Sequence, residues 1–422
     1  MSQHITVFPR EPRWQGEGTH QIPFLAYTSD ELYQRELERF FYRGHWCYVG
    51  LEAEIPEPGD FKRTVIGERS VILVRGLDGK VNVVENVCAH RGMRFCRERN
   101  GNVRKSGFTC PYHQWNYSCE GDLRGVPFRR GVKQDGQMLG GMPADFKLED
   151  NGLTKLKVAT RGGVVFASFD ADVEPFEDYL GPTILGYFDR LFNGRALKIL
   201  GYNRQRIPGN WKLMQENIKD PYHPGLLHTW FVTFGLWRAD NKSQLKMDAQ
   251  HRHAAMISTR GSGGKAEQVT QVSSFKESMQ LNDPRFLDIV PEPWWEGPTA
   301  VMTTIFPSVI LQQQVNSVST RHIQPNGHGS FDFVWTHFGF ADDDEAMTQR
   351  RLRQANLFGP AGFVSADDGE VIEFSQQAFE SKPFHRTLAE LGGRDVGDTE
   401  HMVTETLIRG MYRYWRDVME ER

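Results

Sequence analysis

The sequence predicts an α+β protein in which a small all-β domain is followed by a larger domain whose antiparallel sheet is covered by helices. From Trp46 to about Phe169, short β runs such as SVILVRG and VNVVENV follow one another. Beyond them, helical stretches alternate with long β runs. We therefore expect an N-terminal segment with a helix that packs on the larger domain (1–44), the β domain (45–169) and the larger domain (170–422).

The composition limits the classes of partner. The 422 residues are 39% hydrophobic and 12% aromatic, which is enough apolar material for two cores. The 50 Lys and Arg and the 54 Asp and Glu residues are spread along the chain and leave a net charge of −4, so we expect neither nucleic acid nor a membrane as a partner. The sequence contains neither a run of about 18 apolar residues nor the apolar core of a signal peptide, and we expect a cytoplasmic protein.

The segment before the β domain carries one helix signal. Residues 28–31 (TSDE) resemble a capping box, and the apolar residues of 33–41 then recur at helical spacing. Inside the β domain, Asp78-Gly79 predicts a tight turn between two strands. One amphipathic helix and one hairpin are therefore expected before residue 90.

The larger domain alternates helix and strand signals. Residues 300–324 and 330–340 predict the two strands of a long hairpin that turns at 325–329 (PNGHG). Residues 259–270 (TRGSGGKAEQVT) are expected to form a mobile loop. Helices are expected at 181–192, 211–231, about 344–358 and about 403–419.

Two Cys-His pairs lie in the β domain. Cys88 and His90 form C-x-H, Cys110 and His113 form C-x-x-H, and 19 residues separate the pairs. A Rieske [2Fe–2S] cluster takes these ligands, with two thiolates on one iron and two imidazoles on the other. A structural Cys2His2 zinc site matches the ligand count, but zinc fingers place both cysteines in one pair and both histidines in the other. The mixed pairs favour the Rieske cluster.

The remaining cysteines do not indicate a second centre. The chain has five cysteines at irregular spacing, and an odd number in a long chain disfavours a disulfide framework. We therefore expect Cys47, Cys96 and Cys119 to be ordinary small thiols in or near the core.

A second candidate metal site lies in the larger domain. His223 and His228 are five residues apart in a helical stretch interrupted by a proline and a glycine, so an irregular helix can turn both imidazoles toward one metal. Taken alone, such a pair is more often made of surface or core histidines. A distant carboxylate would complete the site, and Asp367 and Asp368 stand just before a helix signal. Two histidines and one carboxylate form the facial triad of non-haem Fe(II) oxygenases.

Three motifs occur in the order found in one family. They are C-x-H-R-G…C-P-Y-H-x-W around the cluster pairs, E-N-x-x-D-x-Y-H-x4-H at 216–228 and G-P-A-G…D-D-G at 359–369. With them, essentially the whole chain resembles the large (α) subunit of Rieske non-haem iron aromatic-ring-hydroxylating oxygenases. Respiratory Rieske proteins carry two further cysteines that bridge the ligand loops, and Met93 and Tyr112 stand in their places here.

The resemblance implies a role for individual residues. The ligands of the mononuclear iron would be His223, His228 and Asp368. Asp367 is the less favoured carboxylate, because the family's ligand directly precedes the glycine, and it would instead cap the helix. Asp220 would join His113 of one protomer to His223 of the next across a subunit boundary of a trimer, and its carboxylate would orient the iron-binding imidazole.

The resemblance also implies cofactors and partners. We expect a [2Fe–2S] Rieske cluster and a mononuclear Fe(II), with electrons delivered from NAD(P)H through a flavin-dependent reductase and a ferredoxin. A small β subunit completing an α3β3 assembly, or an α3 trimer without it, is expected. A Rieske electron carrier without oxygenase activity is the alternative of another class, and a zinc-stabilised binding module is a further one.

Several stretches, including the FPS-x3-QQ-x2-N strand, most resemble the corresponding stretches of family members that act on aromatic carboxylates. Salicylate, hydroxylated to gentisate, is the first choice of substrate, with anthranilate and terephthalate as the alternatives. In strand register, Gln312, Gln314 and Asn316 would share one face, which either lines a pocket or faces solvent. Candidate substrate-binding residues are Gln314, Ser365 and Asn217. Candidate partners for a carboxylate are Arg321 and Arg409, although arginines more often face solvent or form ion pairs.

Overall fold

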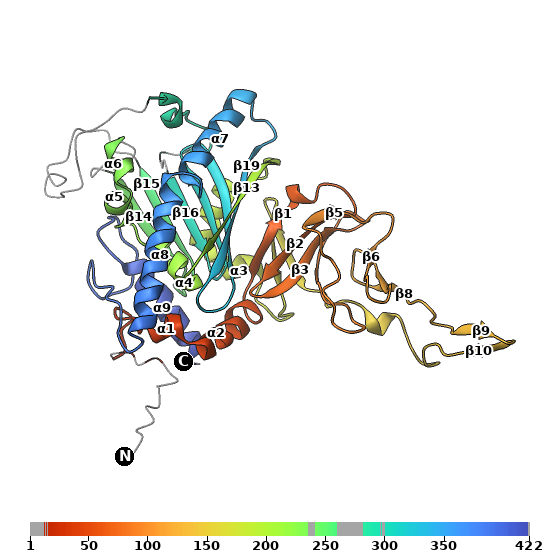
Figure 1. Cartoon of the computed structure of the whole chain (residues 1–422). Coiled ribbons are helices and arrows are strands. Elements are labelled where there is room, and N and C mark those ends of the chain that lie inside the picture. The colour runs from red at the N-terminus through yellow and green to blue at the C-terminus, as the bar shows by residue number, and fades with distance from the viewer. Residues whose placement is uncertain are drawn as a thin grey trace, which may run out of the picture. The chain divides into compact units, whose positions relative to one another are not determined.

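The computed structural model describes residues 12, 14, 16–234, 241–259, 282–295, 297 and 300–420. The chain divides into two compact units (Figure 1). One unit comprises the described residues up to Phe40 together with those from Pro175 onward, and the other comprises Phe41–Glu174. The loop expected at 259–270 lies, apart from Thr259, outside the described residues.

The unit 41–174 is built of short antiparallel strands, as predicted. Its sheets run in the orders β4-β3-β2-β5, β1-β12-β11 and β6-β7-β8, with β9 and β10 as a separate hairpin. The predicted turn joins β3 to β4, and Gly79 has a left-handed φ of +85° there. The strands are β1 (Cys47–Leu51), β2 (Asp60–Ile66), β3 (Arg69–Arg75), β4 (Val81–Glu85), β5 (Asn100–Asn102), β6 (Phe108–Thr109), β7 (Asn116–Tyr117), β8 (Leu123–Gly125), β9 (Val132–Gln134), β10 (Gln137–Leu139), β11 (Lys157–Arg161) and β12 (Val164–Ser168).

The larger unit contains a seven-stranded antiparallel sheet with the order β13-β19-β18-β17-β16-β15-β14. The predicted two-stranded hairpin is wrong, because the segment 300–325 folds as three strands. Its extra reversals lie at 306–308 and at 315–316, where Val315 has a φ of +49°. The strands are β13 (Leu197–Ile207), β14 (Lys242–Met247), β15 (Ala254–Thr259), β16 (Ala300–Ile305), β17 (Val309–Gln314), β18 (Ser317–Pro325) and β19 (Phe331–Phe340).

Helices lie on both faces of this sheet. Lys219 of α4 donates to Thr304, whereas Arg190 of α3 donates to Gln313, which points to the opposite face in strand register. In Figure 1, α8 lies on the viewer's side of the sheet. The helix expected after Asp368 begins five residues earlier, at Phe363. The main helices are α3 (Phe176–Leu191), α4 (Trp211–Lys219), α5 (Pro224–Leu227), α6 (Thr229–Thr233), α7 (Glu345–Phe358), α8 (Phe363–Ser381) and α9 (Thr406–Met419).

The N-terminal helix forms as α1 (Leu25–Thr28) and α2 (Asp30–Glu36), followed by one wider helical turn at Leu37–Phe41. Ser29 caps α2 by accepting from the amide of Leu32 at 3.2 Å. The predicted capping signal is therefore present one residue later than its first threonine.

Glu36 of α2 binds residues of α4 and α9 in the core of the larger unit. Its carboxylate, which has no solvent exposure, accepts from Lys212 of α4 at 2.7 Å. It also accepts from the indole nitrogens of Trp211 at 2.8 Å and Trp415 at 2.7 Å. One carboxylate thus joins α2, α4 and α9 in the core.

Replacing this carboxylate should destabilise the larger unit. In Glu36→Ala, the buried Lys212 ammonium would lose its carboxylate and keep only the side-chain oxygen of Asn210, and we expect a loss of about 3–5 kcal/mol of stability. Glu31→Ala, on the exposed side of the same helix, should cost less than about 1 kcal/mol. Thermal unfolding followed by circular dichroism would test this, and equal melting temperatures for the two variants would contradict it.

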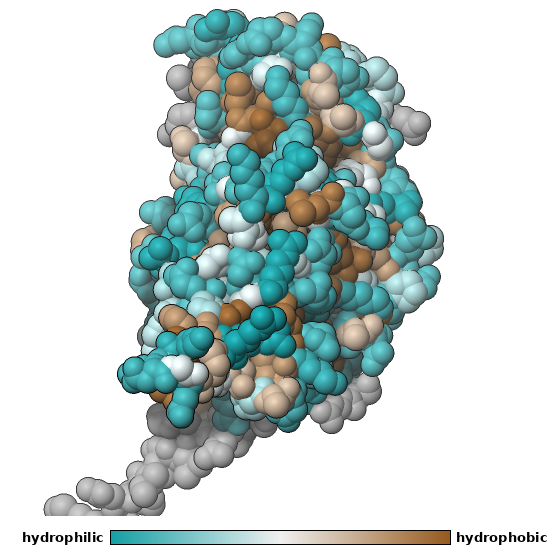
Figure 2. All heavy atoms as spheres, turned by 90° about the vertical axis from the view of Figure 1, so that its right-hand side faces the viewer, coloured by the Kyte–Doolittle hydropathy of each residue, from teal (hydrophilic) through white to brown (hydrophobic). Residues whose placement is uncertain are grey.

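Apolar residues on the molecular face drawn in Figure 2 form small groups among hydrophilic ones. The most exposed large apolar side chains include Phe128, which is 74% exposed, and Phe384. Among the described residues, no helix is long and apolar enough to cross a membrane.

Candidate metal centres

The two cysteine loops of the smaller unit share one backbone pattern. In each, the cysteine amide donates to the carbonyl five residues on, and the amide four residues on donates back to the cysteine carbonyl, at 2.8–2.9 Å. The residue four positions after Cys88 is Gly92, with φ +70°, and the residue four positions after Cys110 is Gln114, with φ +58°. Left-handed φ is costly for a glutamine, so the second loop is held in this shape by its surroundings.

The loops bring the two predicted cysteine ligands close to each other and the two predicted histidine ligands close to each other. The thiols of Cys88 and Cys110 are buried, and the ring centroids of His90 and His113 are 4.5 Å apart. Trp115 stacks on His90 at 4.7 Å. In the described part of the chain, the buried Nδ1 of His90 has no hydrogen-bond partner. Two buried thiols beside two imidazoles, one with an unpaired nitrogen, fit a [2Fe–2S] cluster.

The tyrosine of β7 approaches one cluster cysteine. The hydroxyl of Tyr117 lies 3.1 Å from Sγ of Cys88 and accepts from the amide of Ala89 at 3.1 Å. Since its proton is free to point at the sulfur, the hydroxyl can donate to the thiolate. All five cysteines of the chain are described, and all are buried and free of disulfides. Burial raises the pKa of Cys96 to about 11, which suits an inert thiol.

In the larger unit, His223 and His228 flank a single helical turn. Asp220 precedes Pro221 and is extended (φ −98°, ψ 102°), which ends α4. The chain resumes with Pro224 as the first residue of α5. His223 is the N-cap of this turn and His228 its C-cap, so their ring centroids are 5.4 Å apart.

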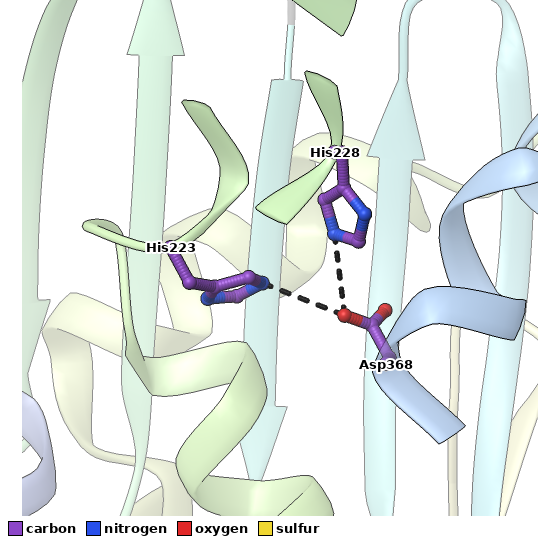
Figure 3. A group of neighbouring side chains, drawn as sticks. All are labelled: His223, His228 and Asp368. Carbon is purple, nitrogen blue, oxygen red and sulfur yellow. Dashed lines mark ion pairs between the residues drawn. The ribbon is translucent and has the colours of Figure 1, made fainter. Parts of the chain in front are cut away.

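Asp368 of α8 completes the group (Figure 3). Its Oδ1 lies 3.5 Å from Nε2 of His223 and 3.2 Å from Nε2 of His228. The three ligand atoms lie within 4.8 Å of one another. Two imidazole nitrogens and one carboxylate oxygen that converge in this way fit a mononuclear non-haem iron.

A carboxylate stands behind each histidine of this trio. Nδ1 of His228 lies 3.1 Å from Oδ2 of Asp367, and Nδ1 of His223 lies 3.6 Å from Oδ2 of Asp220. Metal-binding histidines usually direct their second nitrogen at a carboxylate or carbonyl, which fixes the tautomer and the ring orientation. The expectation that Asp367 caps the helix is therefore wrong. Both aspartates lie inside α8, whose N-cap is Gly362, instead of before it.

The electrostatics of the trio are strongly coupled. Burial disfavours the charged form of His223, but the neighbouring carboxylates of Asp220 and Asp368 outweigh it and raise the pKa of His223 to about 9. Burial also opposes the charge of Asp368, yet its hydrogen bonds to the two histidines hold its pKa well below the usual range. The metal-free trio therefore holds a proton on His223 at neutral pH.

Iron uptake by the metal-free trio should consequently depend on pH. The proton on His223 must leave before the nitrogen can bind a metal. We expect the apparent affinity for Fe(II) to rise about tenfold per pH unit below pH 9 and to level off above it. Competition with a chelator under anaerobic conditions at pH 6.5, 7.5 and 8.5 measures this. An affinity that is constant over this range would contradict it.

The structure places the other predicted site residues as follows. Asn217 of α4 donates to Oδ1 of Asp368 at 3.1 Å. The hydroxyl of Ser365 donates to Gln205 of β13 at 3.1 Å. Gln314 accepts from Gln312 at 2.9 Å, so these two amides share a face.

Asn316 and Arg409 lie in environments that differ from those expected from the sequence. Asn316 does not continue the row of amides, because it lies in the reversal after β17 and binds the backbone of Val290 and the carboxylate of Glu292. Arg409 donates to the carbonyls of Ala389, Leu391 and Asp395. Its guanidinium is thus engaged with the backbone.

A cluster domain of Rieske type and a second domain with a two-histidine, one-carboxylate group define a two-centre iron oxygenase. Residues 45–135 match the Rieske [2Fe–2S] domain, and residues 194–421 match the catalytic domain of ring-hydroxylating α subunits. The chain belongs to the ring-hydroxylating oxygenase α-subunit family, whose members use a Rieske cluster and a mononuclear iron. The alternatives of an electron carrier and of a zinc-stabilised module are not favoured, because neither includes the second domain.

Relatives align over nearly the full chain. The large oxygenase component of salicylate 5-hydroxylase from Ralstonia sp. is 80% identical over 98% of both chains. The large subunit of anthranilate 1,2-dioxygenase from Burkholderia cepacia is 39% identical over 94% of this chain and 92% of its own. Naphthalene 1,2-dioxygenase from Rhodococcus sp. is 24% identical, covers 96% of both chains with a TM-score of 0.78 and has the same fold.

Proposed function

We propose that this chain is the terminal oxygenase component that hydroxylates salicylate to gentisate. The choice of salicylate as the substrate is supported by the 80% identity, over 98% of both chains, to a salicylate 5-hydroxylase component. The net reaction consumes salicylate, dioxygen, NAD(P)H and a proton, and yields gentisate, water and NAD(P)⁺. Anthranilate and terephthalate stay as alternative substrates, because relatives named for them are 39% and 40% identical.

In this proposal, the cluster is held by Cys88 and Cys110 on one iron and by His90 and His113 on the other. The mononuclear iron is held by His223, His228 and Asp368. When bound, the cluster supplies electrons one at a time and the mononuclear iron supplies a site for dioxygen activation.

The residues around the iron ligands have orienting roles in the proposal. Asp367 accepts from the outer nitrogen of His228, so that the inner nitrogen of this ring keeps its lone pair for the metal. The Asp220 carboxylate lies 3.6 Å from the outer nitrogen of His223 and favours a proton on that nitrogen through its charge. Asn217 donates to the ligand oxygen of Asp368 and restricts the carboxylate to one rotamer. Gln314, Ser365 and Asn217 stay candidates for substrate contacts.

The proposal includes partners and an assembly. A ferredoxin and a flavin-dependent reductase deliver the electrons, and the relative's description as an oxygenase component of a larger system supports this. Three α subunits, with or without β subunits, are proposed, and Asp220 then links His113 of one protomer to His223 of the next. The cytosol is the proposed compartment, because it keeps buried thiols reduced.

The chain reconstituted with ferredoxin, reductase and NADH tests the substrate. Salicylate, anthranilate and terephthalate are supplied in parallel under labelled dioxygen, and the products are identified by mass spectrometry. Gentisate carrying one labelled oxygen is the expected product from salicylate. Catechol formed from anthranilate, or a dihydrodiol formed from terephthalate, as the main product would instead favour the corresponding alternative.

A further inference from the structure

One face of the catalytic sheet carries buried polar atoms that lack partners. Residues opposite one another in antiparallel strands share a face, and the register pairs Gln312 with Ser319, Ser319 with His337, and Arg321 with Trp335. On this face, five buried atoms have no hydrogen-bond partner in the described part of the chain. They are Gln312 Oε1, Ser319 Oγ, Arg321 Nε, Trp335 Nε1 and His337 Nδ1. Native proteins leave few buried polar atoms unpaired, so this group indicates a site for a polar ligand.

The same face lies under the helices that carry the iron-site residues. Thr304 of β16 shares this face and accepts from Lys219 of α4 at 2.8 Å. Gln205 of β13 also shares it and accepts from Ser365 of α8, one turn before Asp368. The unpaired atoms therefore line the side of the sheet on which His223, His228 and Asp368 converge.

Arg321 is a buried cation with poor protein partners. Its side chain lies over the Trp335 ring, 4.4 Å from the ring centroid, and one terminal nitrogen lies 3.2 Å from the sulfur of Met302. A thioether is a weak acceptor, and the residues described here place no carboxylate within 4.0 Å of the guanidinium. Burial lowers the pKa of Arg321 to about 9, although the charge of Asp368 acts in the opposite direction. A buried charge of this kind is costly without an anion, so an anionic ligand fits the site.

His337 presents a hydrogen-bond acceptor beside this cation. Its Nε2 lies 2.8 Å from the amide oxygen of Asn203, so Nε2 carries the proton and Nδ1 keeps a lone pair. Burial, and then the charge of Arg321, lower the pKa of His337 to about 4, so the ring is neutral at pH 7. His337 is the diagonal neighbour of Arg321 across β18 and β19, within reach of the same small ligand.

We propose that Arg321 binds the carboxylate of the aromatic acid and that Nδ1 of His337 accepts a hydrogen bond from a donor at the adjacent ring position. This assignment rests on the proposed function, because it names the recognition groups of the same site. A benzoic acid with a hydroxyl or an amino group at position 2 satisfies both residues, because its carboxylate binds Arg321 and its donor binds His337. Terephthalate carries its second substituent on the opposite side of the ring and offers no such donor.

The first test uses the iron-loaded wild-type chain without oxygen. Binding is measured by calorimetry for salicylate, 2-aminobenzoate, 2-fluorobenzoate and 2-hydroxybenzyl alcohol. Fluorine is small and cannot donate, so 2-fluorobenzoate should bind about 10-fold more weakly than salicylate, the value of one hydrogen bond. The alcohol lacks the carboxylate and should bind about 100-fold more weakly.

The second test uses variants of the two residues. Arg321→Gln should raise the dissociation constant of salicylate about 100-fold and leave that of the alcohol unchanged, with Arg321→Lys in between. His337→Leu should remove the preference for salicylate over 2-fluorobenzoate. Arg206→Gln, an exposed arginine of the same sheet that pairs with Asp332, should bind all four ligands like the wild type.

Each outcome decides one part of the inference. If folded Arg321→Gln binds salicylate within about threefold of the wild type, the anchor is overturned. If the wild type binds 2-fluorobenzoate as tightly as salicylate, the role of His337 is overturned. If Arg321→Gln does not fold or does not hold iron, the wild-type chain still tests the anchor. Binding of 2-hydroxybenzyl alcohol as tightly as salicylate would then overturn it. Tight binding of salicylate without its hydroxylation would refute the proposed function and leave the recognition site standing.

Discussion

Asp368→Ala is expected to abolish salicylate hydroxylation, by more than about 1,000-fold, and to lower the iron content from about three to about two per chain. The visible spectrum of the cluster should not change, because its four proposed ligands lie in the other compact unit. The physical reason is that Oδ1 of Asp368 is the atom that both ligand imidazoles approach. Without it, two neutral nitrogens would have to hold the metal. Metal analysis together with the absorption spectrum measures both parts.

The neighbouring aspartate provides a matched control. Asp367→Asn removes the same charge one residue earlier, but it affects only the orientation of His228, through its outer nitrogen. We expect a 10-fold to 100-fold weaker retention of iron, of the size that partners behind a metal ligand usually show. If Asp367→Asn lost all mononuclear iron and Asp368→Ala kept it, the assignment of the carboxylate ligand would be reversed.

Asp220→Asn is expected to lower substrate oxidation about 100-fold while cluster colour and iron content survive. Oδ2 of Asp220 lies 3.6 Å from Nδ1 of His223, and its Oδ1 accepts from the amides of Tyr222 and His223. A neutral amide would keep the backbone contacts and lose the charge that, in the proposal, orients the imidazole and links it to the neighbouring protomer. The step slowed in this variant should therefore be electron transfer from the cluster to the mononuclear iron.

A single-turnover experiment locates this defect. The cluster of Asp220→Asn should be reduced at the normal rate by a chemical reductant, but should be reoxidised slowly when substrate and dioxygen are added. Asp178→Asn, an exposed aspartate near the start of α3, should behave like the wild type. Unchanged turnover in Asp220→Asn would remove the proposed electron route between subunits.

The outline of the fold was predictable where its signals were local. Alternating short β runs and the turn at Gly79 predicted the smaller unit, and apolar periodicity predicted α7 and α9. The hairpin prediction for 300–340 was wrong, since Phe306-Pro307-Ser308 and Val315-Asn316 reverse the chain inside stretches of uniform β propensity. Helix α8 was expected to begin only after Asp368, because its first turns contain glycine, serine and two aspartates, which are weak helix formers.

The sequence by itself was enough to propose the ligand sets of both centres. Cys88 with His90, Cys110 with His113, and His223 with His228 are each separated by five residues or fewer, and a short loop or one helical turn is enough to set how close such pairs can lie. Asp368 was recognisable only through its motif, because 140 positions separate it from His228.

Only the tertiary structure decided what surrounds those ligands. The sequence gives no distance between Asp367 and His228, or between Arg321 and any carboxylate. Those relations arise because α8 packs over the sheet and because the register of β17, β18 and β19 places Arg321 next to Trp335 and His337 on one buried face. Burial and long-range register depend on the whole chain, so the sequence could name Arg321 and Arg409 only as two equal candidates for a carboxylate. Within its described residues, the structure buries Arg321 without a carboxylate partner and engages Arg409 with backbone carbonyls.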